Sequence, residues 1–273
     1  MVLADSLPPP ILWLIGGTGE AIVLAQRLSA GGIPCLVTVT TEAARHRYEP
    51  NSHLWVRVGP LEPRHLVTFI QTQGIGAIVD ASHPFAADIS RAAIAAATAL
   101  GLPYWRYERP PATTAQGSTD LVKRYPSLEA MLEQGILDRQ RVLLTLGYRW
   151  LEAFRPWQQR ATLFARILPS PVALAAALGA GFTSDRLWAI RPPVSAALEA
   201  ALWDQWQITT VVCKASGEAG GEATKQVVAE QLGVRLVIIE RPLIPYPAVS
   251  HRLDHTLAFC QQWWQSQSSS ANF

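Results

Sequence analysis

The sequence predicts an α/β protein made of two parallel-sheet domains that face each other across a cleft. In the first half, short apolar runs alternate with segments of helical periodicity, and the same alternation resumes after Glu108–Thr119, a stretch rich in proline, threonine and serine. Alternating strands and helices form parallel sheets through right-handed crossovers. We therefore expect one domain in residues 1–118 and a second in residues 119–273.

The first half opens with the strand that defines its sheet. Ile11–Ile15 is a continuous apolar run ending in glycines, which is typical of a buried parallel strand. Glu20–Ala30 has apolar residues on one face and is closed by two glycines, which predicts a helix. The other strands and helices expected in this half are Pro34–Thr40, Leu54–Val58, Pro63–Gln73, Ala77–Asp80, Phe85–Leu100 and Pro103–Tyr107.

The second half repeats this pattern and adds a terminal helix at His251–Gln265. Its expected strands are Leu121–Tyr125, Val142–Leu146, Leu163–Ile167, Leu187–Ile190, Thr210–Cys213 and Leu236–Ile239. Its other expected helices are Ser127–Gln134, Pro171–Leu178, Val194–Trp206 and Glu222–Leu232.

Composition excludes several classes of protein. The 273 residues are 49% hydrophobic, which is ample for a packed core, and the net charge of +2 gives no electrostatic case for a nucleic-acid partner. The three cysteines lie far apart without metal-ligand spacing, so we expect no metal site and no disulfide framework. No signal peptide is visible, and no uncharged stretch reaches the roughly 20 strongly apolar residues of a spanning helix. We expect a cytoplasmic protein with no membrane partner. The sequence leaves the oligomeric state open, a monomer included.

The strongest local signal is Gly16-Gly17-Thr18-Gly19-Glu20, between the first strand and the first helix. Glycines let backbone amides approach a diphosphate, and the following helix N-terminus carries about half a positive charge. The alternative is an ordinary tight turn. Because the loop opens the first strand–helix unit of a parallel sheet, we interpret it as the phosphate loop of a Rossmann-like dinucleotide-binding domain.

The end of the second strand indicates which dinucleotide binds. NAD sites usually place Asp or Glu there, whereas this strand ends in Thr40 and Thr41, with Arg45 four residues later. Hydroxyls and a guanidinium suit the 2′-phosphate of NADPH, so we predict NADPH rather than NADH. Glu42 is discordant, and its alternative interpretation is a solvent-facing residue at a helix start.

The fourth strand leads into a second polar loop that contains Ser82, His83 and Pro84. At a strand's carboxyl end these residues belong to the expected cofactor site. Ser82 is expected to cap the following helix and Pro84 to occupy its first turn. His83 is either a hydrogen-bonded anchor or a catalytic residue.

A third loop follows the strand that ends at Cys213. Lys214 stands at the strand tip, and a glycine-rich segment leads from it into a helix that contains Lys225. This position favours a site role for Lys214, whereas Lys225 is equally compatible with a solvated surface charge.

Taken together, GGTGE after the first strand, DASHPFA after the fourth, the ERP segment at Glu108–Pro110 and KASGEAGGEATK at Lys214–Lys225 resemble the precorrin-6A reductase family of vitamin B12 biosynthesis. They occur in the family's order and spacing, and the similarity extends from Ile11 to Pro242.

The resemblance implies a two-domain oxidoreductase that binds NADPH on its N-terminal domain and a tetrapyrrole polycarboxylate in the cleft. It implies reduction of one double bond of precorrin-6A, or of its cobalt form, to the 6B form, without flavin or metal. Lys214 would orient the substrate or stabilise charge, and the proton donor would be His83, Asp88 or water. The substrate-binding candidates are the amides of Ser216, Gly217, Gly220 and Gly221, the side chains of Arg109 and Lys225, and the loop with Thr145 and Gly147.

Three other kinds of protein share part of this pattern. A short-chain reductase needs a Tyr-x-x-x-Lys pair, which does not follow Tyr104, Tyr107 or Tyr148. A non-catalytic NADPH-sensing protein would not need Lys214 or its loop. A methyltransferase that uses S-adenosylmethionine also has a glycine-rich first loop, but the strand end at Thr40 and Thr41 lacks the acidic residue expected for it.

Overall fold

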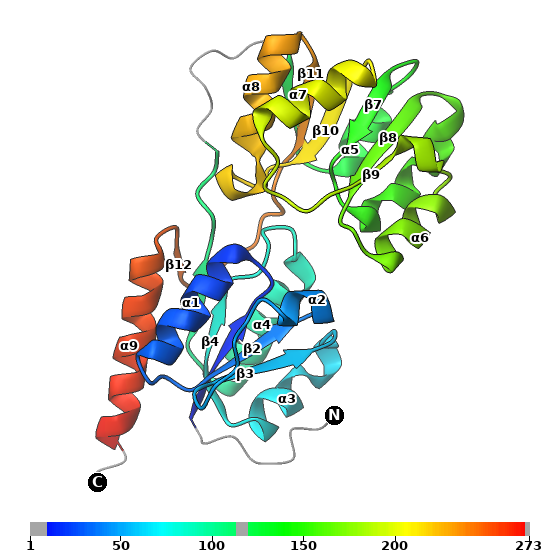
Figure 1. The fold of residues 1–273 in the computed structure, drawn as a ribbon. Helices are drawn as coiled ribbons and strands as arrows, with labels where there is room; N and C mark the ends of the chain where they lie inside the picture. The colour runs from blue at the N-terminus through cyan, green and yellow to red at the C-terminus, as the bar shows by residue number, and fades with distance from the viewer. Residues whose placement is uncertain (1–9, 113–119, 271–273) are drawn as a thin grey trace. The chain divides into compact units, whose positions relative to one another are not determined.

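The computed structural model describes residues 10–112 and 120–270, which form two compact units. One unit combines Met1–Glu108 with Leu243–Phe273, and the other is Arg109–Pro242. Each unit contains one six-stranded sheet in which every strand pair is parallel (Figure 1). The predicted α/β class with two parallel sheets is confirmed.

The first unit is built from alternating strands and helices. Its elements are β1 (Ile11–Ile15), α1 (Gly19–Ala30), β2 (Cys35–Val39), α2 (Glu42–Arg45), β3 (Leu54–Val58), η1 (Pro63–His65), α3 (Leu66–Thr72), β4 (Ile75–Asp80), α4 (Ala87–Leu100), β5 (Tyr104–Tyr107), β12 (Val249–Ser250) and α9 (Leu253–Ser270). The strand order is β12-β5-β4-β1-β2-β3. This is the doubly wound arrangement, and its order reverses between β1 and β4.

Alternation along β1 decides which helices cover each face of this sheet. Leu12 and Leu14 are buried in a core with α1 and α9. Trp13 and Ile15 point to the opposite face and are buried against α3 and α4. This is the period of two that a strand covered on both faces requires.

The second unit follows the same plan. Its elements are β6 (Val122–Tyr125), α5 (Leu128–Glu133), β7 (Arg141–Leu144), η2 (Tyr148–Gln159), β8 (Thr162–Ile167), α6 (Pro171–Gly179), η3 (Ser184–Arg186), β9 (Leu187–Ala189), α7 (Ala196–Gln205), β10 (Thr210–Lys214), η4 (Glu218–Gly220), α8 (Glu222–Leu232) and β11 (Arg235–Ile239). The strand order is β6-β11-β10-β7-β8-β9, so the order reverses between β7 and β10.

The two sheets therefore correspond strand by strand, except at one edge. In the first unit the edge position beside β5 is filled by β12, which the chain supplies after it has completed the second unit. In the second unit the equivalent position beside β11 is filled by β6, the first strand of that unit.

The C-terminal segment does not follow the predicted division. We expected residues 119–273 to form the second domain, but β12 pairs with β5, and α9 packs beside α1 (Figure 1). Cys260 and Trp263 of α9 are buried in the core of the first unit. An apolar helix face can be recognised from the sequence, but not the sheet that it covers. The predicted boundary at residue 118 lies outside the described residues.

Several local expectations also need correction. The short elements α2 and β12 and the 12-residue 3-10 helix η2 were not expected, and α4 begins at Ala87 rather than Phe85. In the part of the chain that is described, none of the helices is long and apolar enough to cross a membrane.

Candidate active site

Thr18 joins the two loops that leave the first sheet at its reversal point. Its hydroxyl accepts a hydrogen bond from the amide of Ala21 at 3.1 Å, which caps α1. The same hydroxyl donates to the carbonyl of Ala81, after β4, at 2.8 Å. The predicted phosphate loop and the predicted loop at Ser82 are thus adjacent, at the edge where such sheets bind ligands.

Gly16 is required where the first loop crosses β2. A Cβ atom built on it would lie 2.7 Å from the hydroxyl of Tyr48 and 2.8 Å from Cγ1 of Val37, closer than side chains pack. The hydroxyl of the buried Tyr48 accepts from the amide of Gly17 at 3.1 Å, and burial raises its pKa. Tyr48 therefore stays neutral and holds the loop against the strand.

Gly17 and Gly19 are the residues of this loop that leave room for a ligand. Both are exposed, and a Cβ atom built on either would have no protein atom within 4 Å. The open space begins at the N-terminus of α1, where the helix end attracts anions. An exposed backbone at a helix N-terminus is the kind of position at which proteins bind a diphosphate.

The end of β2 presents the groups that were predicted to bind the 2′-phosphate. Thr40 and Thr41 are exposed, and Thr41 caps α2 by accepting from the amide of Ala44 at 3.2 Å. Arg45 lies in the same short helix, with a guanidinium nitrogen 3.5 Å from a carboxylate oxygen of Glu42. An exposed pair of this kind contributes at most about 1 kcal/mol, so a phosphate can readily replace Glu42 as the partner of Arg45.

The loop after β4 differs from its expected geometry. Ser82 is buried and does not cap α4, because Ala86 holds the N-cap position of that helix. The hydroxyl of Ser82 instead accepts a hydrogen bond from a guanidinium nitrogen of Arg106 at 3.1 Å. Pro84 precedes the helix rather than standing in its first turn. His83 is half-buried, and its Nδ1 lies 3.2 Å from the amide of Phe85. In that contact the ring nitrogen accepts, so a neutral His83 carries its proton on Nε2.

A buried charge network beneath this loop was not predicted. Asp80, the last residue of β4, accepts from Arg106 at 2.8 Å, from the amide of Ser82 at 2.9 Å, and from the hydroxyls of Ser90 and Tyr104 at 2.5 and 2.7 Å. Arg106 is fully buried and also contacts Glu108 at 2.8 Å. Burial alone would lower the pKa of Arg106, but the two carboxylates outweigh it and raise that pKa.

Removing the hydroxyl of Tyr104 should measure how much this network stabilises the first unit. Tyr104→Phe leaves Asp80 with one donor fewer, so we expect the free energy of unfolding in urea to fall by about 1.5–3 kcal/mol. In an Asp80→Asn background the same change should cost much less, because the charged acceptor is gone. Equal costs in the two backgrounds would show that the hydroxyl does not act through Asp80.

Lys214 occupies the corresponding edge of the second sheet. It ends β10, and its ammonium nitrogen lies 4.0 Å from the centre of the Trp150 ring, in η2. Burial, with a smaller contribution from the charge of Arg149, lowers the pKa of Lys214 to about 8. The segment that follows β7 therefore contacts the end of β10, at the reversal point of this sheet, through a cation–π interaction.

The glycine-rich loop after Lys214 is internally hydrogen-bonded. The amide of Ser216 donates to the carbonyl of Lys214, that of Gly217 to the carboxylate of Glu222, that of Gly220 to Gly217, and that of Gly221 to Glu218. The hypothesis that these four amides donate to substrate carboxylates therefore does not hold for this conformation.

Lys225 holds the glycine-rich loop through hydrogen bonds to its backbone. It is 2% exposed, and its ammonium group donates to the carbonyls of Gly220 and Gly221 at 3.3 and 3.0 Å. Burial lowers the pKa of Lys225. Its predicted role as a direct substrate ligand does not fit this buried position, and its contacts make it a residue that positions the loop.

The other predicted substrate residues lie around the same edge. Arg109 is half-buried, and its guanidinium is 3.4 Å from the carbonyl of Ser216. The hydroxyl of Thr145 donates to the carbonyl of Val212 at 3.2 Å, and Gly147 is exposed immediately before η2.

A family model described as "Precorrin-6x reductase CbiJ/CobK" matches residues 11–261. This range includes the loops that follow β1, β4, β7 and β10. The chain belongs to this reductase family. Membership confirms the predicted resemblance and identifies the protein as an oxidoreductase.

Relatives of this reductase are similar over nearly their whole length. A cobalt-precorrin-6A reductase of Synechocystis sp. is 49% identical over 260 residues, which cover 95% of this chain and 98% of the relative. A cobalt-precorrin-6A reductase of Priestia megaterium is 31% identical over 243 residues, covering 88% and 93%. The solved structure of CobK precorrin-6A reductase aligns with a TM-score of 0.77 at 26% identity, covering 93% of this chain and 97% of that one.

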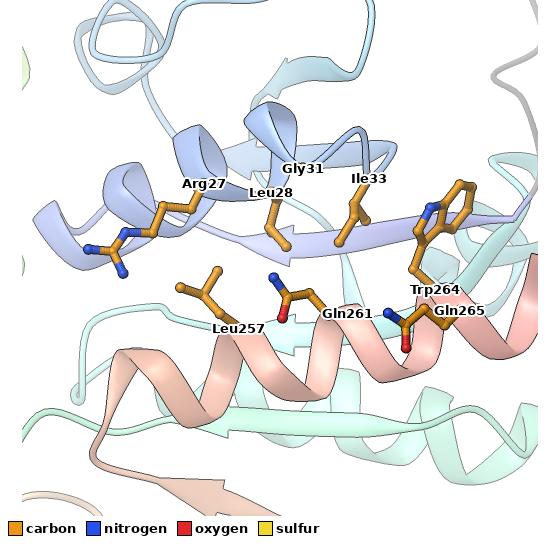
Figure 2. Close-up of a pocket in the computed structure, with 8 residues that line it drawn as sticks. All are labelled: Arg27, Leu28, Gly31, Ile33, Leu257, Gln261, Trp264 and Gln265. Carbon is orange, nitrogen blue, oxygen red and sulfur yellow. The ribbon is translucent and has the colours of Figure 1, made fainter.

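The reductase also has a pocket of about 310 Å³ between α1 and α9 (Figure 2). It is lined by Arg27, Leu28, Gly31, Ile33, Leu257, Gln261, Trp264 and Gln265. This pocket lies at the C-terminal end of α1, whereas the phosphate loop precedes its N-terminal end, and it contains none of the predicted site residues.

Sequence reasoning missed several residues that shape the site. Arg106 had a recognisable signal, because a charged side chain inside a four-residue buried strand must find a counter-charge, and Asp80 ends the neighbouring strand. Tyr48 and Trp150 had no recognisable sequence signal, because each contacts the site from an element that lies far from it in the chain.

Proposed function

We propose that this reductase reduces one double bond of precorrin-6A, or of cobalt-precorrin-6A, to the 6B form with NADPH. The observation that carries the proposal is the family match over residues 11–261, which contains both the glycine loop after β1 and the lysine loop after β10. The names of the two relatives, which both include cobalt, favour the cobalt form as the better substrate.

On the cofactor side, support comes from the open backbone at Gly17 and Gly19 and from the N-terminus of α1, which suit a diphosphate. Thr40, Thr41 and Arg45 would hold the 2′-phosphate, and the loop of Ser82, His83 and Pro84 would hold the nicotinamide end. When bound, NADPH supplies the hydride.

On the substrate side, the side chain of Lys214 is proposed to bind the macrocycle and to stabilise the charge that develops as the double bond is reduced. Its place at the reversal point of the second sheet supports this role. Thr145 and Gly147, on the neighbouring loop, are proposed to help position the ring. His83 is proposed to hold a proton on Nε2 near the reacting atoms.

The direct test mixes the purified protein with NADPH and precorrin-6A, with and without cobalt. We expect NADPH oxidation coupled to a change in macrocycle absorbance, and much slower oxidation of NADH. NADPH binding without any oxidation would instead identify a sensor. Equal or faster use of NADH would contradict the assignment of Thr40, Thr41 and Arg45.

The pH dependence of turnover should report the protonation of Lys214. Its pKa of about 8 lies below that of a free lysine, so the cationic form predominates below pH 8 and is lost above it. We expect the rate at saturating substrate to fall as pH rises through about 8. Lys214→Arg, which stays charged, should remove this decrease, although its overall rate will be lower. An identical high-pH limb in both proteins would assign the titration to another group.

A further inference from the structure

The triplet Glu-Arg-Pro occurs twice in the chain, as Glu108-Arg109-Pro110 and as Glu240-Arg241-Pro242. The first follows β5 and the second follows β11, and these two strands hold equivalent positions in their sheets. The chain leaves the first unit after Glu108 and returns to it after Pro242. Both triplets therefore stand where the chain passes from one unit to the other.

Each triplet ends its strand in the same way. The amide of Glu108 donates to Ser250 of the edge strand β12 at 2.9 Å, and the amide of Glu240 donates to Tyr125 of the edge strand β6 at 2.8 Å. The proline two residues later has no N–H group to continue the ladder, and it restricts the arginine before it to extended backbone.

The two arginines converge on the residues that follow Lys214. The Nε of Arg241 donates to the carbonyl of Ala215 at 2.8 Å, and its Nη1 donates to the carbonyl of Arg109 at 2.6 Å. Its Nη2 is 3.3 Å from the carbonyl of Pro110. Arg109 in turn reaches the carbonyl of Ser216 at 3.4 Å. The guanidinium of Arg241, on the segment that returns to the first unit, thus contacts both the lysine loop and the outgoing segment, Arg109–Pro110.

Gly217 completes this contact. It has a positive φ of 72°, and a Cβ atom built on it would lie 2.6 Å from the carbonyl oxygen of Pro110 and 3.0 Å from Nη2 of Arg241. The loop therefore rests directly on the outgoing segment, and only glycine allows this approach.

We propose that Arg109 and Arg241 form a clamp that fixes the backbone of Ala215 and Ser216 and thereby positions Lys214. This assigns both arginines as positioning residues, and it rests on the role of Lys214 given in the proposed function. The two guanidinium groups donate charge-assisted hydrogen bonds to four carbonyls, and two of these, Ala215 and Ser216, belong to the loop. Any shift of Arg109–Pro110 or of Arg241 is therefore passed to the two residues that follow Lys214.

The test compares Arg241→Met with Arg241→Lys, Arg109→Met and the control Arg141→Met. Arg141 is a suitable control because it is also half-buried and its Nε donates to a backbone carbonyl, that of Trp206, at 2.8 Å. It is the first residue of β7, so it lies at the amino ends of the strands, whereas the lysine loop leaves the same sheet at their carboxyl ends. The readouts are amide hydrogen exchange of residues 214–222, the NADPH dissociation constant, and kcat and KM for the macrocycle.

For Arg241→Met we expect exchange of the loop amides to rise by about tenfold and kcat to fall by about tenfold, consistent with the loss of charge-assisted hydrogen bonds. The dissociation constant for NADPH should stay within about twofold. Arg109→Met should show a smaller effect of the same kind, Arg241→Lys should recover part of both losses, and Arg141→Met should change neither.

Unchanged loop exchange in Arg241→Met would overturn the clamp. The same conclusion would follow if Arg141→Met disturbed the loop and kcat as much as Arg241→Met. Because hydrogen exchange needs no substrate, it tests the clamp even if the protein does not reduce precorrin-6A. Conversely, if the clamp hypothesis is wrong, the wild-type protein is still expected to reduce precorrin-6A.

Discussion

Replacing Lys214 with alanine should lower the turnover of the macrocycle by about 100-fold or more, the loss expected when a group that stabilises developing charge is removed. The affinity for NADPH, measured by fluorescence titration, should stay within about twofold, because Lys214 belongs to the second sheet and the phosphate loop to the first. Lys214→Met should behave like alanine, since it keeps the apolar stem beside Trp150 but lacks the charge.

The matched control is Lys123→Ala, an exposed lysine on β6 of the same sheet, which should leave both quantities unchanged. Wild-type turnover in Lys214→Ala would exclude the lysine from the reaction. A loss of NADPH affinity as large as the loss of turnover would place its effect on the cofactor instead.

Gly19→Ala should weaken NADPH binding by at least about tenfold without harming the fold. The new methyl group meets no protein atom within 4 Å, and alanine has the higher helix propensity, so the melting temperature should stay the same or rise. The added Cβ would instead occupy the space where the diphosphate approaches the loop.

Gly179→Ala provides the comparison for this second prediction. Gly179 is also a terminal helical glycine with no atom within 4 Å of an added Cβ, but it ends α6 in the second unit. It should leave NADPH affinity unchanged. If Gly19→Ala bound NADPH as tightly as the wild type, the diphosphate would not rest on this loop.

The placement of the site loops could be predicted from local pattern. The strand Ile11–Ile15 followed by glycines, and the strand ending at Cys213 followed by Lys214, each indicate a strand that delivers a loop to the carboxyl edge of a parallel sheet. These inferences need only the period of apolar residues and the chemistry of glycine, which act over a few neighbouring positions.

The contacts within the loops could not be predicted in the same way. The amide of Gly217 donates to Glu222 rather than to a ligand, and Lys225 is buried under Gly220 and Gly221. Whether a polar group faces a ligand or its own loop depends on backbone dihedrals, which the residue types alone leave open.

By itself, the sequence determined the α/β class, the alternation of strands and helices, and the four loops that carry the family resemblance, because each follows from short-range patterns. Only the tertiary structure decided that β12 and α9 complete the first unit, that Arg106 neutralises Asp80, and that both Glu-Arg-Pro triplets meet the lysine loop. These contacts join residues far apart in the chain, and their free energy depends on burial and geometry that exist only once the sheets have formed.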